Sequence, residues 1–244
     1  MSTSDKLITI AENMSKVHEA GKKSGQDNLW NGIVEEKTNY TFAFLGWQME
    51  YMRPPTKIIP ITNDSFNQTF RGNSKLKIIE ADYFDFSQKK EGTTAQTSYY
   101  YTFYDCRALE KVEDLGIGTV YPIYQFGRTF FNCYLINTIE KITVAETTKF
   151  ANVFDYCHRL TNITFDGVIG QSGLDFHWSS LSKASIENII NHLSSTATGK
   201  SITLPKAAIN TAFNINLDDE TTYPEGSEYY VLRHSKDNWT INYS

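Results

Sequence analysis

The stretch Phe154-Asp155-Tyr156-Cys157-His158-Arg159-Leu160-Thr161-Asn162-Ile163-Thr164-Phe165 contains the pattern that decides the fold. A phenylalanine is followed three residues later by a cysteine, and aliphatic residues come at further steps of three. The same frame begins at Phe70, Phe103 and Phe130, with Asn73 in place of the cysteine in the first of these copies. The four phenylalanines are 33, 27 and 24 residues apart. Intervals of this size are typical of proteins built from stacked repeats.

Each copy ends in a segment that predicts a short strand. One strand and one turn cannot bury their apolar side alone, but stacked copies can bury a continuous row of equivalent residues. We expect the aliphatic positions to face inward. They are Leu76/Ile79/Ala81, Leu109/Val112/Asp114, Leu160/Ile163/Phe165 and, if three extra residues follow Cys133, Ile139/Ile142/Val144.

The repeated frame resembles the BspA-type leucine-rich repeat, whose recurring phrase is close to A-F-x-x-C-x-x-L-x-x-I-x-I. The chain departs from that phrase at Asn73, at the stretched third copy and at the polar Asp114. The resemblance implies an α/β protein in which short parallel strands stack into a leucine-rich repeat solenoid. The specific motif covers residues 70–165.

We expect three parts along the chain: an N-terminal helix over residues 1–27, an N-terminal cap over 28–65, and a leucine-rich repeat domain with its C-terminal cap over 66–244. In the first part, apolar residues at alternating steps of three and four form a narrow helical seam. The seam either packs against the first repeat or forms a homo-oligomer. The aromatic second part, with Pro54-Pro55, predicts an extended β cap. Both parts look like the segments that precede such repeats in proteins of phage and prophage regions of Gram-positive bacteria.

The C-terminal part predicts a helix and further strands. Leu174-Asp175-Phe176 restarts the frame without a cysteine, and Ser182 is suited to cap a helix. The apolar stripe of that helix is expected to contain Ala184, Ile186, Ile189, Ile190 and Leu193. Strands are expected at 200–204 and 239–243, with an acidic loop at 217–226.

Composition excludes some classes of partner. The net charge of −5 and the pI of about 5.6 argue against nucleic acid, because phosphate binding needs a concentrated basic surface. No apolar stretch approaches a membrane span, and no signal peptide is recognised at the N-terminus. All three cysteines occupy one phase of the repeat, which predicts a row of buried free thiols; one disulfide between neighbouring copies is the alternative.

No catalytic or metal-binding constellation is visible, so we expect a non-enzymatic protein without cofactors or metals. Cys157 and His158 are adjacent in the sequence, but neighbouring residues on an irregular segment tend to point apart. The alternative is a hydrolase with its site in the loops between repeats. Asp175, His177 and Ser179 within hydrogen-bonding reach of one another would favour that alternative.

Two columns of outward-facing side chains are expected on the repeat strands, because residues between inward positions point to the other face. These are the predicted binding residues for a protein or cell-surface ligand: Ile78, Lys111, Lys141 and Asn162 in one column, and Glu80, Glu113, Thr143 and Thr164 in the other. The run Tyr99-Tyr100-Tyr101 suits a contact surface, or alternate rings cover the core.

The sequence therefore favours a structural or binding protein used for protein or surface recognition and adhesion. The resemblance implies a phage or prophage protein, located on the virion or the cell surface. A cytoplasmic scaffold for other proteins is the alternative.

Overall fold

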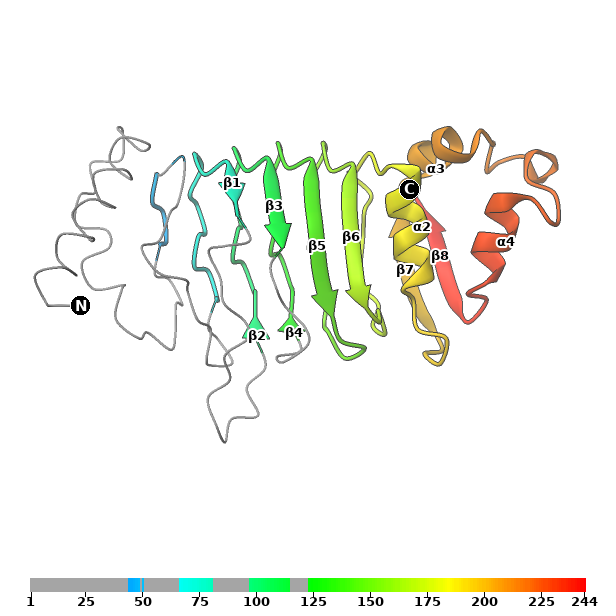
Figure 1. The fold of residues 1–244 in the computed structure, drawn as a ribbon, viewed down its shortest axis with the longest axis horizontal. Helices are drawn as coiled ribbons and strands as arrows, with labels where there is room; N and C mark the ends of the chain where they lie inside the picture. Colours follow the sequence, from blue (N-terminus) through cyan, green and yellow to red (C-terminus); the bar gives the residue numbers. More distant parts are fainter. Residues whose placement is uncertain (1–43, 49, 51–65, 81–96, 115–122) are drawn as a thin grey trace, which may run out of the picture.

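The computed structural model describes residues 44–48, 50, 66–80, 97–114 and 123–244 as a mixed α/β structure with parallel strands. The described strands follow one another along the long axis of the molecule, and helices gather at the C-terminal end (Figure 1). The expected helix at 1–27 lies outside the described residues, as do nearly all of the expected cap at 28–65 and the expected inward residue Ala81. The proposed division into three parts remains a prediction.

A four-stranded parallel sheet runs along one side of the molecule. Its strands are β1 (Ile78–Ile79), β3 (Lys111–Asp114), β5 (Thr138–Val144) and β6 (Asn162–Gly167), in the order β1-β3-β5-β6. Ile79, Val112, Ile139 and Ile163 are buried, and each pairs with the next across the sheet. The aliphatic residue six positions after Asn73 or a cysteine therefore faces the core in every copy, as expected.

The third copy departs from the expected alignment. No extra residues follow Cys133, because Ile139 pairs with Val112 on one side and with Ile163 on the other. The irregularity lies inside β5 instead, where Glu140 and Lys141 stand opposite the single residue Thr164 before Ile142 pairs with Phe165. This is a β-bulge, which adds one residue to a strand without moving the residues before it.

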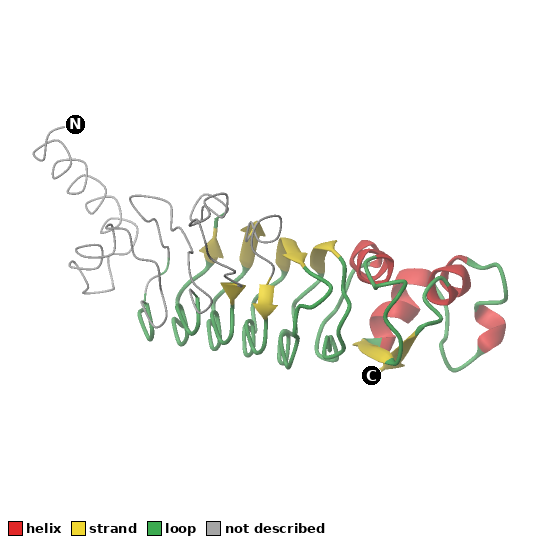
Figure 2. Cartoon of the chain, turned by 90° about the horizontal axis from the view of Figure 1, so that it is seen from below, coloured by secondary structure: helices red, strands yellow, loops and turns green. Residues whose placement is uncertain are grey.

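Two short strands lie on the other side of the core. They are β2 (Thr97–Ser98) and β4 (Ile123–Gln125), which pair in parallel. Just after them come the turns that contain the repeated phenylalanines, and these turns form a row on the side opposite the four-stranded sheet (Figure 2). In residues 66–80, 99–114 and 126–144 the chain thus passes from a turn on one side to a strand on the other.

The phenylalanines form a continuous stack through the core. Phe44, Phe70, Phe103, Phe130, Phe154 and Phe176 are buried, with consecutive ring centroids 4.8–5.9 Å apart and planes within 16° of parallel. Phe44 precedes the four copies that the sequence identified, and Phe176 follows them. Buried aromatic area of this size dominates the energetics of a core.

The cysteines occupy equivalent surroundings. The Cys106 Sγ donates to the carbonyl of Phe70, Cys133 to that of Phe103 and Cys157 to that of Phe130, each at 3.1 Å. All three are free and buried, so the prediction of free thiols is confirmed and the alternative of a disulfide is wrong. Burial raises the pKa of each thiol, because the core disfavours the thiolate.

The turns need a left-handed backbone at the second residue after each phenylalanine. Gly72, Asp105, Asn132 and Tyr156 have φ values of 75°, 62°, 62° and 63°. Glycine, aspartate and asparagine adopt this conformation readily, but tyrosine does so only at a cost.

Helix α2 (Lys183–Asn191) covers the free edge of β6. The hydroxyl of Ser182 accepts a hydrogen bond from the Ser185 backbone N–H, which confirms the predicted cap. Ile186, Ile189, Ile190 and Leu193 are buried as expected, but Ala184 is exposed and Ser185 is buried instead.

Ser185 and Asn188 replace the missing neighbour of β6. The Ile163 N–H donates to the Ser185 Oγ at 2.9 Å, and the Phe165 N–H donates to the Asn188 Oδ1 at 2.7 Å. The Asn188 Nδ2 donates in return to the Phe165 carbonyl at 3.2 Å. The helix therefore satisfies backbone groups that an open strand edge would leave unpaired.

The remaining elements form the C-terminal end. Strands β7 (Lys200–Leu204) and β8 (Trp239–Tyr243) pair in parallel, which confirms both predicted strands. Between them lie α3 (Lys206–Phe213), the short 3-10 helix η2 (Glu220–Thr222) within the expected acidic loop, and α4 (Glu228–His234).

Candidate interaction surfaces

On the outer side of the four-stranded sheet, six of the eight predicted binding residues lie in the column in which they were expected. In the first column Ile78, Lys111 and Asn162 are connected by strand pairing, but the β5 residue between Lys111 and Asn162 is Thr138. Lys141 pairs with Asp114 further along the strands, so its placement in this column is wrong. The error follows from the alignment of the third copy.

The second column shows the same displacement. Glu80, Glu113 and Thr164 are half-buried or exposed, and the β5 residue that directly follows Ile139 is Glu140. Thr143 pairs with Asp166 near the end of β5 and is only 8% exposed, so its placement in this column as a solvent-exposed residue is wrong. We define the sheet face by the corrected set: Ile78, Glu80, Lys111, Glu113, Thr138, Glu140, Asn162 and Thr164.

Lys111 connects neighbouring strands on the sheet face. Its Nζ lies 2.6 Å from the Glu140 Oε1 on β5 and 3.2 Å from the Glu113 Oε1 on its own strand. The pKa of Lys111 is raised, first by the hydrogen bond to Glu140 and then by that to Glu113. Exposed pairs of this kind add little stability, so the charges remain available to a ligand.

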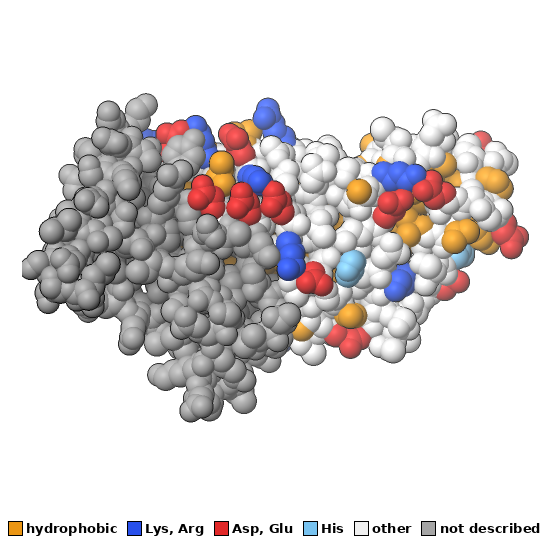
Figure 3. Space-filling model, viewed as in Figure 1, with side chains coloured by type: hydrophobic (Ala, Val, Ile, Leu, Met, Phe, Trp, Pro, Cys, Tyr) orange, Lys and Arg blue, Asp and Glu red, His pale blue; other side chains and the backbone are white. Residues whose placement is uncertain are grey.

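Carboxylates outnumber lysines on this surface. The sheet face contains three carboxylates, Glu80, Glu113 and Glu140, and one lysine, Lys111. Acidic and basic side chains are visible together over β1, β3 and β5 in the space-filling view (Figure 3). The surface therefore has a net negative charge, which favours cationic groups in a partner.

A second surface lies over the row of turns. Its aromatic side chains stack across neighbouring copies: the rings of Tyr104 and Phe131 lie 4.9 Å apart, and those of Tyr156 and Trp178 lie 5.0 Å apart. Tyr156 and Trp178 remain 38% and 39% exposed, among the most exposed large apolar side chains in the described residues. We define the turn face as Arg71, Tyr101, Tyr104, Arg107, Arg128, Phe131, Tyr134, Tyr156, His158 and Trp178.

Guanidinium groups cover rings of the turn face. Arg71 lies over Tyr101 at 5.3 Å and over Tyr104 at 5.1 Å, and Arg107 lies over Tyr134 at 5.8 Å. Arg128 lies over Tyr101 at 5.5 Å and also donates to its hydroxyl. The pKa of Tyr101 is lowered, mainly by a side-chain hydrogen bond with Tyr100 and also by Arg128. These cation–π contacts hold the arginines in fixed orientations.

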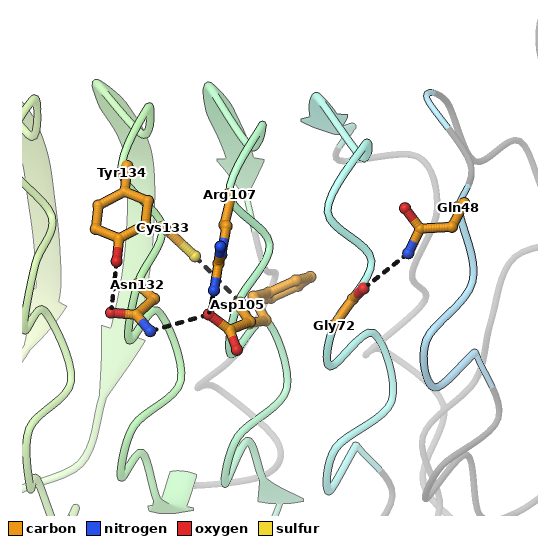
Figure 4. A network of polar contacts seen from close by, with 8 residues as sticks. Gln48, Gly72, Asp105, Arg107, Asn132, Cys133 and Tyr134 are labelled. Atoms are coloured by element: carbon orange, nitrogen blue, oxygen red, sulfur yellow. Dashed lines mark hydrogen bonds and ion pairs between the residues drawn. The ribbon is translucent and has the colours of Figure 1, made fainter.

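Polar groups connect the turns beneath these rings (Figure 4). The Asn132 Nδ2 donates to the Asp105 Oδ1 of the preceding turn at 2.9 Å, and Arg107 donates to the same oxygen at 3.3 Å. Further along the row, the Gln48 Nε2 donates to the Gly72 carbonyl at 3.0 Å. The network fixes the spacing of the turns.

The turn face was only partly visible in the sequence. Of the tyrosine run, Tyr99 is buried while Tyr100 and Tyr101 are half-buried, so the run both covers the core and reaches the surface. The stacking of Tyr104, Phe131, Tyr156 and Trp178 was not predicted. The sequence pattern that could have predicted it is the second aromatic residue that lies between each phenylalanine and the cysteine or serine of the same turn.

The arrangement expected of a hydrolase is not formed. The Asp175 Oδ1 accepts a hydrogen bond from the backbone N–H of His177, and the His177 ring packs edge-on against Trp178. The Ser179 hydroxyl is buried and has no hydrogen-bond partner among the described residues. Cys157 and His158 point apart, since the thiol is in the core and the imidazole stacks on Tyr134.

Two hollows of the described surface lie in the C-terminal part. One of about 400 Å³ lies between Ser179–Lys183 and α3, and another of about 400 Å³ is lined by Tyr223, Arg233 and His234. Within the described residues there is no group of three or more histidines, cysteines or carboxylates that could hold a metal ion. Nor do those residues include a helix with the length and apolar composition needed to cross a membrane.

Comparison of the chain with protein-family models, with curated proteins and with solved structures found no match.

Proposed function

We propose that this protein is a non-enzymatic binding protein: a leucine-rich repeat solenoid resembling the BspA type that recognises a protein or cell-surface ligand through its sheet face. The stacked phenylalanines, the equivalent thiol hydrogen bonds and the in-register parallel strands support the solenoid. These features fit a structure in which each repeat contacts its neighbours.

The observation that carries the proposal is the contrast between the two sides of the sheet. Ile79, Val112, Ile139 and Ile163 are fully or almost fully buried on the inner side. The alternating residues on the outer side reach solvent, and all of them except Ile78 are polar or charged. A flat surface of aligned strands with closely spaced charges suits recognition by electrostatic complementarity.

The excess of carboxylates points to a ligand with cationic groups. Lys111 holds Glu113 and Glu140 together at the centre, so a lysine or arginine of a partner would meet a preformed pair of carboxylates. Nucleic acid is a poor candidate, since its phosphates would face these carboxylates.

The proposed setting is the particle of a phage or prophage of a Gram-positive bacterium, with the ligand on the cell surface. This setting rests on the resemblance of the repeats. A cytoplasmic scaffold would use the same sheet face for an internal protein partner.

The test measures attachment of the fluorescently labelled full chain to intact Gram-positive cells by flow cytometry. We expect saturable attachment. Loss of attachment after the cells are pretreated with protease would identify a protein ligand, and retention would identify a glycan. The triple variant Lys111→Ala, Glu113→Ala, Glu140→Ala should reduce affinity at least about tenfold, which corresponds to about 1.4 kcal/mol.

A matched control is Glu187→Ala with Lys200→Ala, which removes charges from α2 and β7 and leaves the sheet face intact. It should attach like the wild type. Equal attachment of the triple variant would reject the sheet face. Binding to an isolated cytoplasmic protein alone would favour the scaffold.

A further inference from the structure

Two central rings of the turn face, Tyr104 and Tyr134, have both of their faces occupied, so that only their edges meet solvent. Tyr104 lies between the Arg71 guanidinium and the Phe131 ring, and Tyr134 lies between Arg107 and His158. Stacking of a sugar or a nucleic-acid base needs a free ring face. Fixed guanidinium groups beside ring edges suit carboxylates instead.

Several residues of the turn face have a left-handed backbone conformation, which is energetically unfavourable for most side chains. Tyr101 and Arg128 have φ values of 58° and 51°, and the equivalent residue of the next turn is Asn152 at 51°. The turn therefore accepts asparagine, which adopts this conformation more readily than tyrosine or arginine. Strained positions cluster at functional surfaces, so these side chains have a use beyond forming the turn.

The first turns also concentrate positive charge. Residues 66–76, 99–109 and 126–136 contain Arg71, Lys75, Arg107 and Arg128 but only one carboxylate, Asp105. This excess stands out in a chain of net charge −5. Tyrosine, tryptophan and arginine are the residues enriched at energetically dominant positions of protein interfaces.

The same chain contains a complementary segment. Residues 216–228 contain five carboxylates and no lysine or arginine. Asp218 pairs with Lys206 and Glu228 with Lys183. Asp219, Glu220 and Glu225 are exposed and form no ion pair with a described residue.

We propose that the turn face binds the acidic segment 216–228 of a second copy of this chain. The segment lies at the C-terminal end of the long axis, while the cationic turns belong to the copies nearer the opposite end (Figure 1). The two surfaces differ, so the contact is heterologous and leads to chains or rings of subunits rather than to a closed two-fold dimer.

The experiment is sedimentation velocity of the full chain over a micromolar concentration series, at about 50 mM and about 500 mM NaCl. The wild type should form species larger than a dimer at low salt and dissociate at high salt. Arg107→Gln with Arg128→Gln should weaken association at least about tenfold, as should Glu220→Gln with Glu225→Gln. Asp219 is left unchanged because its side chain caps η2.

Mixing the two double variants gives the sharpest outcome. Each retains one intact surface, so an equimolar mixture should form heterodimers that do not grow further. Lys200→Gln is the matched control and should assemble like the wild type. Circular dichroism and thermal unfolding of every variant separate loss of contact from loss of fold.

Several results would overturn the proposal. One is a wild-type chain that sediments as a monomer throughout the concentration series. Binding of an anionic polymer such as heparin by the arginines would not change that conclusion. Another is assembly that both Gln variants retain. The predicted N-terminal helical seam includes Ile10 and Val17. Assembly that is lost when these two residues are replaced by aspartate would assign the contact to that seam instead.

Discussion

The three cysteine-containing turns and the turn at Phe176 share the phenylalanine stack and one backbone hydrogen bond, but the turn at Phe176 has no left-handed residue at Trp178. Phe176 stacks on Phe154 at 4.8 Å, much as Phe154 stacks on Phe130 at 5.9 Å. The Ser179 N–H donates to the Phe176 carbonyl at 2.8 Å, and the Cys157 N–H donates to that of Phe154 at 3.0 Å. The aromatic stack therefore does not require the thiol.

The difference appears after the turn. Each cysteine thiol donates to the carbonyl of the repeated phenylalanine in the preceding copy, while the Ser179 hydroxyl reaches no described partner. A strand follows the cysteine turns, and α2 follows the turn at Ser179. The phenylalanines therefore hold neighbouring turns together, the thiols complete each junction, and helix α2 ends the sheet.

The largest effect is expected from breaking the aromatic stack. Phe130→Ala removes a fully buried ring between Phe103 and Phe154, and should lower the free energy of unfolding by about 3–5 kcal/mol. Phe131→Ala is the matched control, since the neighbouring ring is half-buried and stacks on Tyr104; it should cost about 0.5–1.5 kcal/mol. Urea unfolding measures both, and equal losses would refute the role of the stack.

The next effect tests how the helix ends the sheet. Asn188→Ala leaves the Phe165 N–H and carbonyl without their partner, at an expected cost of about 2–4 kcal/mol from two unsatisfied groups. Asn191→Ala, at an exposed position of the same helix, should change the free energy of unfolding by less than about 1 kcal/mol. Similar values for the two variants would mean that α2 covers β6 by apolar packing alone.

Exchanging the thiol and the hydroxyl tests whether the cysteine turns and the turn at Ser179 differ through this hydrogen bond. Cys133→Ser should place a buried hydroxyl beyond reach of the Phe103 carbonyl, as at Ser179, and lower the free energy of unfolding by about 1–3 kcal/mol. Ser179→Cys should supply the missing donor and raise it by about 0.5–1.5 kcal/mol. Both shifts are measurable by thermal or urea unfolding; a destabilising Ser179→Cys would show that the last turn has no room for sulfur.

The core was predictable because its residues recur at constant spacing. Phe70, Phe103, Phe130 and Phe154 are all buried, as are the aliphatic residues three and six positions after Asn73 or the cysteines. The strand and helix in 183–204 followed from an ordinary cap and an apolar stripe. The third copy was misaligned because the aliphatic run of β5 fits two registers, and only pairing with β3 and β6 selects one.

Other features could not be inferred from local pattern. Ser185 and Asn188 are polar residues on the inner side of a helix, and their use becomes clear only with β6 beside them. Phe44 was missed because Trp47 occupies the cysteine position, although Phe44-Leu45-Gly46 shares its Phe-x-Gly with Phe70-Arg71-Gly72. The turn face depends on side chains that meet only when copies stack.

The smallest effect concerns pH and separates the buried thiols from Ser179. Burial raises the pKa of Cys106, Cys133 and Cys157, so the folded state keeps their protons while the unfolded chain releases them above about pH 8.5. Their contribution to stability is therefore complete below that pH and is progressively lost as the pH rises toward the folded-state pKa. Each thiol should account for about 1 kcal/mol of lost stability between about pH 8.5 and about pH 9.5.

Cys133→Ala tests this through the slope of the free energy of unfolding against pH. The absolute free energy of unfolding is not used, because the lost packing changes it as well. The variant should lose about one third of the alkaline decline in the free energy of unfolding, measured by urea titration at each pH, because one of three equivalent thiols is gone. Ser179→Cys should steepen the decline by a similar amount if its new thiol is buried like the others. Tyr229, whose pKa is also raised by burial, titrates only above about pH 10 in the unfolded chain and does not interfere in this range. An unchanged slope in both variants would mean that the thiols are reached by water in the folded state, and the distinction between the cysteine turns and the Ser179 turn would then lie in α2 alone.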